Sequence, residues 1–137
     1  MTNSREIEVY VRFSETDAAG HVNNTSYFLY LEEARTKFFY KLGIGEGDSN
    51  SVFNFILAST KCDYLEQAFA TNMLNVSTNV SNIGTKSFTV DHVITTTDTE
   101  AVVAHATATL VYFNYAKQKT EAIPDSIRSL LEPILVG

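Results

Sequence analysis

The sequence of 137 residues is poor in the features that mark several specialised classes of protein. It has one cysteine, Cys62, which excludes an intramolecular disulfide bond and a cysteine-based metal site. Ten basic residues are scattered among sixteen acidic ones, and a net charge of −6 without a lysine or arginine cluster argues against nucleic-acid binding. No segment approaches the run of about 18 apolar residues that a membrane-spanning helix needs, so we expect no membrane partner.

Several other signals are absent. Residues 1–6 contain no apolar stretch of the kind found in signal peptides, so we expect a cytoplasmic protein. No repeat or linker divides the chain, and its length is that of one domain, residues 1–137. The sequence contains neither a glycine-rich nucleotide-binding loop nor a P-loop. His92 and His105 lie in strand-like segments, far in sequence from any cluster of acids or cysteine, so we expect no metal and no cofactor.

The pattern of apolar residues predicts one strand followed by one long helix. Apolar and polar residues alternate over 7–13, which predicts the strand. Asn23 or Asn24 is a suitable N-cap for a helix that runs to about Leu42, and Gly43 follows where a terminating glycine is expected. The expected apolar face of this helix consists of Tyr27, Tyr30, Leu31, Ala34, Phe38 and Leu42.

Strand patterns then occupy most of the chain up to a short C-terminal helix over 124–131, which has Pro124 near its start. The expected fold class is α+β, because a run of antiparallel strands can bury a single apolar helix only by curving around it. The expected strands cover 52–64 with a break near Ser59 and Thr60, then 73–80, 88–94 and 101–113.

The most informative segment is the connection between the first strand and the helix, residues 12–27. It places Asp17 and a turn glycine, Gly20, shortly before the two asparagines at the helix start. A carboxylate just before a helix N-terminus faces backbone N–H groups that have no partner within the helix. Those N–H groups can hold an oxyanion while the carboxylate acts on water or on a carbonyl group. The segment therefore indicates a hydrolytic site.

The same segment resembles the signature of the 4-hydroxybenzoyl-CoA thioesterase family of hotdog-fold proteins. The resemblance is strongest from Asp17-Ala-Ala-Gly-His-Val-Asn-Asn-Thr-Ser-Tyr27 to Tyr30-Leu-Glu-Glu-Ala-Arg35. It continues in Cys62-Asp-Tyr-Leu65, in Ile83-Gly-Thr-Lys-Ser-Phe88 and in Ile123-Pro-Asp125, and so covers nearly the whole chain.

The resemblance implies a five- or six-stranded antiparallel sheet wrapped around one long central helix. It implies a homodimer that joins sheets edge to edge, or a homotetramer built from such dimers. The active site is then expected at the dimer interface, between the Asp17 loop of one subunit and strands of the other. The implied substrate is an acyl-CoA, hydrolysed to the free acid and CoA.

Site residues follow from the same resemblance together with their chemistry. Asp17 is implied to be the nucleophile or general base, since its carboxylate is ionised at neutral pH. The backbone N–H of Asn24 is the expected oxyanion donor, with that of Thr25 as a neighbouring candidate. Gly20 is expected to provide a turn that a Cβ would forbid. His21 is either a general base or, more commonly in such a loop, a residue that holds the loop by hydrogen bonds.

The remaining candidates are substrate-binding residues. Tyr27 either contacts substrate or packs the helix on the sheet. The resemblance places Thr85 and Lys86 near the nucleotide of CoA, where a lysine is a point charge for phosphate, although a solvated turn lysine fits equally well. Glu32 and Arg35 are spaced to form a structural ion pair on the helix.

Two other functions remain open from the sequence. A hotdog dehydratase or hydratase needs a catalytic histidine with a nearby acid on the helix, and the surroundings of His21 lack that pattern. A non-catalytic acyl-CoA-binding protein has no need of the acid at Asp17. The acyl group itself is undetermined, because a set of aromatic residues can either line a tunnel or fill the core: Phe38, Phe39, Phe53 and Phe55.

Overall fold

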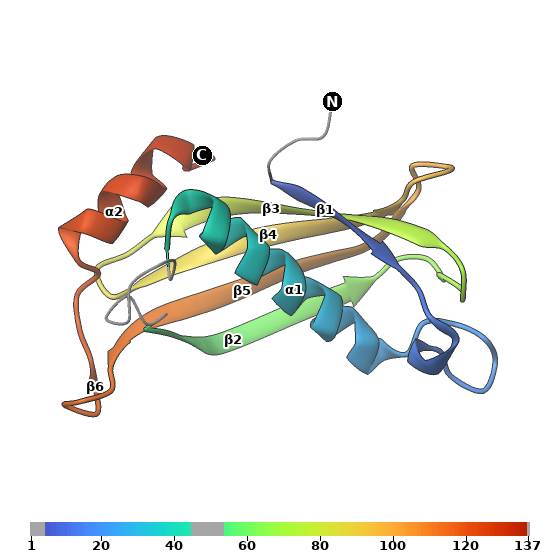
Figure 1. The fold of residues 1–137 in the computed structure, drawn as a ribbon, viewed down its shortest axis with the longest axis horizontal. Helices are drawn as coiled ribbons and strands as arrows, with labels where there is room; N and C mark the ends of the chain where they lie inside the picture. Colours follow the sequence, from blue (N-terminus) through green and yellow to red (C-terminus); the bar gives the residue numbers. More distant parts are fainter. Residues whose placement is uncertain (1–4, 45–53, 137) are drawn as a thin grey trace.

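The computed structural model describes residues 5–44 and 54–136. A curved antiparallel sheet lies behind one long helix, α1, and a short helix, α2, lies at one end (Figure 1). The strands follow the order β1-β3-β4-β5-β2, with β6 paired to β5, and every pair is antiparallel. This architecture confirms the expected α+β hotdog fold. The elements are β1 (Glu6–Tyr10), η1 (Phe13–Glu15), α1 (Asn24–Leu42), β2 (Phe55–Tyr64), β3 (Met73–Ile83), β4 (Ser87–Thr96), β5 (Val102–Asn114), β6 (Lys119–Thr120), α2 (Asp125–Leu131) and η2 (Glu132–Ile134).

Both ends of α1 have the caps that the sequence predicts. Asn23 is the N-cap, and its side-chain oxygen accepts a hydrogen bond from the backbone N–H of Thr25 at 3.0 Å. Gly43 ends the helix with φ of 87°, in the left-handed region that glycine adopts without strain. Its N–H donates to the carbonyl of Tyr40 at 3.0 Å. The helix is therefore fixed in length by local interactions at each end.

The core lies between α1 and the concave face of the sheet. The helix residues expected to face inward are buried, apart from Leu42, which is half-buried. Strands β3, β4 and β5 alternate buried and half-buried residues, so one face of each strand packs on the helix. Small side chains on β5 leave room for the helix, namely Ala104, Ala106 and Ala108.

The end of the first strand differs from the sequence-based expectation. The first strand ends at Tyr10 and not at Phe13, because the N–H of Arg12 donates to the Glu15 side chain at 2.9 Å and starts a turn. Phe13 is consequently 85% exposed. The expected break in the second strand is present as a register shift between Leu57 and Ser59. The expected start of that strand, residues 52 and 53, lies outside the described residues.

Strand β2 forms one edge of the sheet and is exposed along most of its length. Its apolar side chains include Ile56 and Leu57, which are 36% and 45% exposed. An unpaired edge with apolar side chains is a template for pairing with another chain.

Across residues 5–44 and 54–136, no helix has both the length and the apolar character that crossing a membrane requires.

A polar layer interrupts the core between two hydrophobic clusters. Thr78 and His92 are fully buried on paired positions of β3 and β4, and Arg35 of α1 is 7% exposed. The His92 Nδ1 lies 3.1 Å from the Thr78 hydroxyl and 3.2 Å from the carbonyl of Ser77, while its Nε2 has no partner among the described residues. Burial, together with the positive charge of Arg35, lowers the pKa of His92 to about 4. His92 is therefore neutral in the folded protein at neutral pH.

This depressed pKa predicts acid sensitivity. In the unfolded chain, His92 binds a proton below the ordinary histidine pKa of 6.5. In the folded protein it binds that proton only near pH 4. The free energy of unfolding should therefore fall by up to about 3 kcal/mol between pH 6.5 and pH 4 through this residue. Urea denaturation at a series of pH values should show a smaller fall for His92→Gln. An unchanged slope in His92→Gln would rule out this origin.

Candidate active site

The loop before α1 holds Asp17 in a closed turn. Its Oδ1 accepts hydrogen bonds from the backbone N–H groups of Ala19 at 2.9 Å and His21 at 3.1 Å. Its own N–H donates to the carbonyl of His21 at 2.7 Å. Gly20 sits in this turn with φ of 85°, which explains the glycine. The second carboxylate oxygen, Oδ2, makes no hydrogen bond with any described residue, so it remains available to a ligand.

The start of α1 presents one backbone donor beside this loop. The N–H of Thr25 is already bound to the Asn23 side chain, and that of Ser26 donates to the Asn23 carbonyl at 2.9 Å. The N–H of Asn24, the first helical residue, has no acceptor in the part of the chain that the structure describes. Of the two expected oxyanion donors, Asn24 is thus the one whose N–H is unoccupied, and Thr25 has its N–H occupied by the cap.

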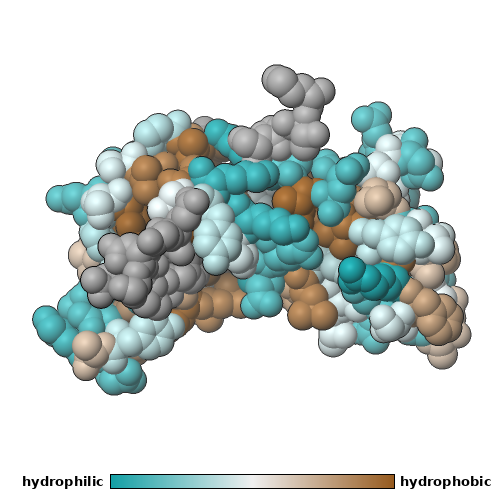
Figure 2. Space-filling view, viewed as in Figure 1, coloured by the Kyte–Doolittle hydropathy of each residue, from teal (hydrophilic) through white to brown (hydrophobic). Residues whose placement is uncertain are grey.

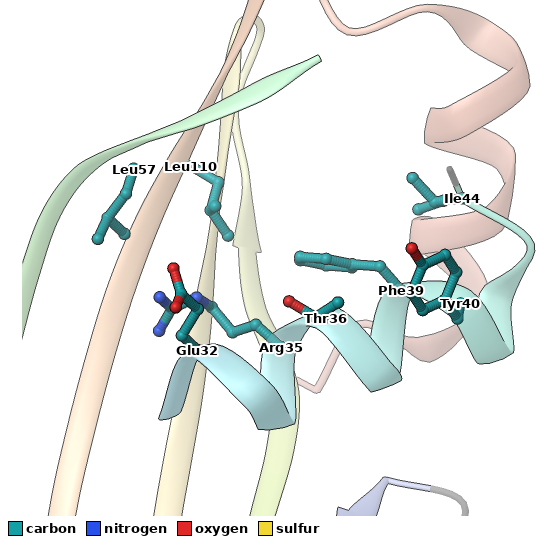
Figure 3. Close-up of a pocket in the computed structure, with 8 residues that line it drawn as sticks. All are labelled: Glu32, Arg35, Thr36, Phe39, Tyr40, Ile44, Leu57 and Leu110. Carbon is teal, nitrogen blue, oxygen red and sulfur yellow. The ribbon is translucent and has the colours of Figure 1, made fainter. Parts of the chain in front are cut away.

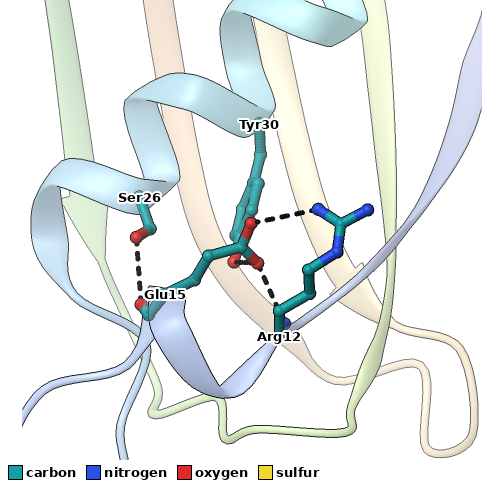
Figure 4. Close-up of polar contacts among 4 residues, drawn as sticks. All are labelled: Arg12, Glu15, Ser26 and Tyr30. Carbon is teal, nitrogen blue, oxygen red and sulfur yellow. Dashed lines mark hydrogen bonds and ion pairs between the residues drawn. The ribbon is translucent and has the colours of Figure 1, made fainter.

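A partly buried carboxylate ties the preceding turn, η1, to the helix (Figure 4). The Oε1 of Glu15 accepts from the hydroxyl of Tyr30 at 2.9 Å, and its backbone carbonyl accepts from the hydroxyl of Ser26 at 2.9 Å. Burial alone would raise the pKa of Glu15, but hydrogen bonds from Arg12 and Tyr30 outweigh it and hold the pKa below its usual value. The charged Glu15 therefore fixes η1, and with it the start of the Asp17 loop, against α1.

Asp17 and Asn24 line a common cavity of about 410 Å³. Tyr64, at the end of β2, closes one side and donates from its hydroxyl to the Asn24 carbonyl at 3.3 Å. The ring of Tyr27 lies 5.1 Å from that of Tyr64 and is 4% exposed. Burial raises the pKa of Tyr27 to about 12, so its hydroxyl stays protonated at neutral pH. The full lining is Asp17, His21, Val22, Asn24, Tyr27, Tyr64, Leu65, Glu66 and Gln67.

His21 contributes to the loop mainly through its backbone. Its N–H and carbonyl both bond Asp17, while its ring packs edge-on against Phe69 at 5.0 Å. Cys62, on β2, is half-buried, and burial raises the pKa of its thiol, which keeps it protonated at neutral pH. Among the described residues, no group of three or more His, Cys, Asp or Glu side chains is placed to hold a metal ion.

The structure does not bring Thr85 and Lys86 to Asp17 within one protomer. The β3–β4 turn that contains Lys86 lies beside Tyr112, whose N–H donates to the Lys86 carbonyl at 2.8 Å. Tyr64, by contrast, pairs with Ala104. The two positions are therefore separated by about 25 Å along β5.

The sequence reasoning missed part of this lining. Leu65, Glu66 and Gln67 reach the cavity because the chain turns back after β2, where the N–H groups of Leu65 and Glu66 donate to the carbonyl of Val103. Only the Asp-Tyr-Leu stretch of the resemblance pointed to this region. The anchoring role of Glu15 had one available signal, its spacing of three from Arg12, which is that of a capping box.

Comparison with protein families finds one matching family model. It describes the thioesterase-like superfamily and matches residues 11–131. Among curated proteins, the uncharacterized protein YsmA of Bacillus subtilis is 38% identical over 85 residues, 62% of this chain and 56% of YsmA. The long-chain acyl-CoA thioesterase FadM of Escherichia coli is 27% identical over 135 residues, 95% of this chain and 98% of FadM. The chain thus spans about half of the first relative and nearly all of the second.

Solved structures share the whole fold. A predicted thioesterase from Bacillus stearothermophilus superposes with a TM-score of 0.86 at 28% identity, covering 96% of both chains. A thioesterase from Thermus thermophilus, complexed with coenzyme A and Zn, superposes with a TM-score of 0.81 at 25% identity, covering 94% of this chain and 92% of that one. Because the coverage is this high, the likeness extends through the sheet, α1 and the connection between β1 and α1.

The Glu15 anchor predicts a stability cost on removal of one hydroxyl. Tyr30→Phe should lower the free energy of unfolding by about 1–3 kcal/mol, because it removes a hydrogen bond to a partly buried carboxylate. Urea denaturation at neutral pH measures this change. Tyr10 is 50% exposed, so Tyr10→Phe serves as the control and should stay within about 0.5 kcal/mol of wild type. Equal stabilities for both variants would show that the Glu15–Tyr30 bond contributes nothing.

Proposed function

The chain belongs to the thioesterase-like superfamily and is a thioester hydrolase, and from this premise we propose that it hydrolyses acyl-CoA with Asp17 as the catalytic carboxylate. The observation that carries this proposal is the shared cavity of Asp17 and Asn24. It combines a carboxylate oxygen without a hydrogen bond to any described residue and a backbone N–H without an acceptor there, at the positive end of a 19-residue helix.

The reaction uses each group at a defined step. The thioester carbonyl oxygen accepts a hydrogen bond from the Asn24 N–H, which stabilises the negative charge that develops on this oxygen. Asp17 Oδ2 deprotonates a water, and the water oxygen bonds to the carbonyl carbon. The C–S bond then breaks, the departing CoA thiolate takes up the proton held by Asp17, and the acid leaves. Loss of one such backbone donor costs about 100- to 1,000-fold in rate in other hydrolases.

A direct attack by Asp17 is the second route open to the same geometry. In that case Oδ2 itself bonds to the carbonyl carbon, the C–S bond breaks and releases CoA, and water then hydrolyses the resulting mixed anhydride. The two routes share every residue and differ in the covalent intermediate. In water enriched in oxygen-18, a single turnover labels the Asp17 carboxylate only through the anhydride.

Asp17→Asn is expected to abolish most of the activity. The amide keeps the size of the side chain but cannot take a proton or attack a carbonyl. Steady-state assays of thiol release should show kcat lower by several orders of magnitude, with KM near the wild-type value. Asp98→Asn, in the β4–β5 turn, is the control and should match wild type. Wild-type turnover by Asp17→Asn would end this mechanism.

We also propose that the protein is a homo-oligomer built from dimers that pair β2 with β2, and that it acts in the cytoplasm. The exposed edge of β2 supports the dimer, as do the apolar side chains of Phe28 and Leu29, at 36% and 60% exposed on α1. A second copy on this edge would satisfy the unpaired backbone groups and cover the apolar surface. A homotetramer built from two such dimers stays within this proposal.

Antiparallel pairing would make the site a shared one. A two-fold axis that pairs β2 with its copy places the Tyr64 end of one strand beside the Phe55 end of the other. The cavity of Asp17 would then adjoin the opposite end of the second protomer. Lys86 and Thr85 lie at that end, so Lys86 of the second copy is the proposed contact for CoA phosphates. This arrangement accounts for a substrate-binding lysine far from Asp17 in its own protomer.

The dimer has a direct solution test. Light scattering coupled to size-exclusion chromatography should report a dimer or a tetramer at micromolar concentration. Ile56→Lys should shift the protein toward monomer and reduce activity, because it places a charge in the β2 edge. Val102→Lys is a matched control on an exposed position of β5 and should leave the mass unchanged. A fully active wild-type monomer would contradict the shared site.

A further inference from the structure

A second cavity lies further along α1, between the helix and strands β2 and β5 (Figure 3). Its volume is about 260 Å³. Arg35, one of its lining residues, lies about 16 Å along the helix axis from Asn24. Much of the wall is apolar, formed by Phe39, Ile44, Leu57 and Leu110.

Arg35 is an unpaired cation in this wall. It is only 7% exposed, yet its guanidinium forms neither a hydrogen bond nor an ion pair with the residues that the structure describes. The ion pair expected with Glu32 is not formed there, although both side chains line the same part of the cavity (Figure 3). Burial lowers the pKa of Arg35 and the charge of Glu32 raises it. Arg35 remains protonated, because arginine does not lose its proton in proteins.

A guanidinium that is mostly buried and makes no hydrogen bond to the protein is unfavourable for folding alone, because much of its hydration is lost. The same arrangement is favourable in a ligand pocket, where apolar walls enclose a few polar groups that fix orientation. We propose that this cavity receives the distal end of the acyl group, and that Arg35 donates hydrogen bonds to an oxygen atom carried at that end. Arg35 would thus determine which acyl-CoA is preferred.

The position of the cavity fits this role, and the inference rests on the proposed function. The cavity reaches Leu57 near the start of β2, whereas the Asp17 cavity reaches Tyr64 at its end. In the proposed dimer, antiparallel pairing of β2 would place the Arg35 cavity of one protomer next to the Asp17 cavity of the other. An acyl chain that starts at Asp17 would extend into the Arg35 cavity of the second copy.

The charge of Glu32 determines which oxygen-containing group at the end of the acyl chain binds best beside Arg35. A hydroxyl group can accept from Arg35 and donate to Glu32, so both charged groups gain a partner. A carboxylate satisfies Arg35 with two hydrogen bonds but faces the negative charge of Glu32. Both groups carry an acceptor oxygen at the distal end of the acyl chain, and the charge of Glu32 favours the hydroxyl group. An unsubstituted chain leaves Arg35 unpaired.

The test compares substrates that differ only at that end. Straight-chain acyl-CoA thioesters of increasing length are assayed in three forms: unsubstituted, with a terminal hydroxyl and with a terminal carboxylate. At the length that reaches Arg35, wild type should prefer the hydroxyl form over the unsubstituted form by about 10- to 100-fold in kcat/KM. Shorter chains should show no preference. Glu32→Gln should shift the preference toward the carboxylate.

Three variants separate recognition from a structural role. Arg35→Met should remove the preference for the hydroxyl form, and Arg35→Lys should keep part of it. In the absence of substrate Arg35→Met should melt at the same temperature as wild type or higher, because the unpaired charge is gone. Lys37→Met, which removes an exposed cation from the same helix, should keep the wild-type preference.

The results of these assays distinguish a wrong role for Arg35 from a failure of the proposed function. If Asp17-dependent hydrolysis of unsubstituted acyl-CoA is present but no chain length shows a preference, the role of Arg35 is wrong and the activity stands. If Arg35→Met melts lower and loses activity equally on all three forms, Arg35 is structural. If wild type hydrolyses no acyl-CoA, the proposed function fails first.

Discussion

The candidate site depends on how the N-terminus of α1 is held. Asn23 caps the helix with its side chain, and its backbone N–H donates to the Glu15 carbonyl at 2.9 Å. Glu15 in turn accepts the hydroxyl of Tyr30 from the next turn of the same helix. The loop that carries Asp17 is thus joined to the helix at both of its ends. A catalytic carboxylate and a backbone donor are held in one rigid unit, which is the preorganisation that electrostatic catalysis requires.

The rest of the fold serves this unit by surrounding one helix. The concave sheet buries the inward face of α1 and leaves the side next to β2 open, where both cavities lie. On the face shown in Figure 2, hydrophilic side chains lie across the middle and hydrophobic ones lie on either side. An exposed edge strand lowers the solubility of a monomer, but the edge of β2 provides the surface on which the proposed dimer forms. The same surface would join the Asp17 cavity of one copy to the Arg35 cavity of the other.

Much of this arrangement was predictable because it is written in local sequence. The caps Asn23 and Gly43, the period of α1 and the alternation in β3, β4 and β5 each depend on a few neighbouring residues, and all are present. The end of β1 was not predictable from alternation, because the Glu15 side chain competes for the N–H of Arg12.

Features that depend on residues far apart in the chain could not be predicted from the sequence. Helical spacing predicted a structural pair of Glu32 and Arg35 on the helix. Arg35 is instead buried without that ion pair, near enough to His92 for its charge to lower the pKa of His92. Likewise, no pattern places Lys86 at the opposite end of the sheet from Asp17. That separation follows from strand order and register, which only the folded structure provides.

The central claim is that α1 and the Asp17 loop form the hydrolytic site. It is tested most directly by a crystal structure with an acyl-CoA analogue in which a methylene group replaces the thioester sulfur, leaving a ketone that cannot be hydrolysed. The account predicts the ketone oxygen at hydrogen-bond distance, about 3 Å, from the Asn24 N–H. It also predicts the ketone carbon beside Asp17 Oδ2 or beside a water bound to it. A ketone bound elsewhere, with Asp17 and Asn24 both facing solvent, would contradict the account.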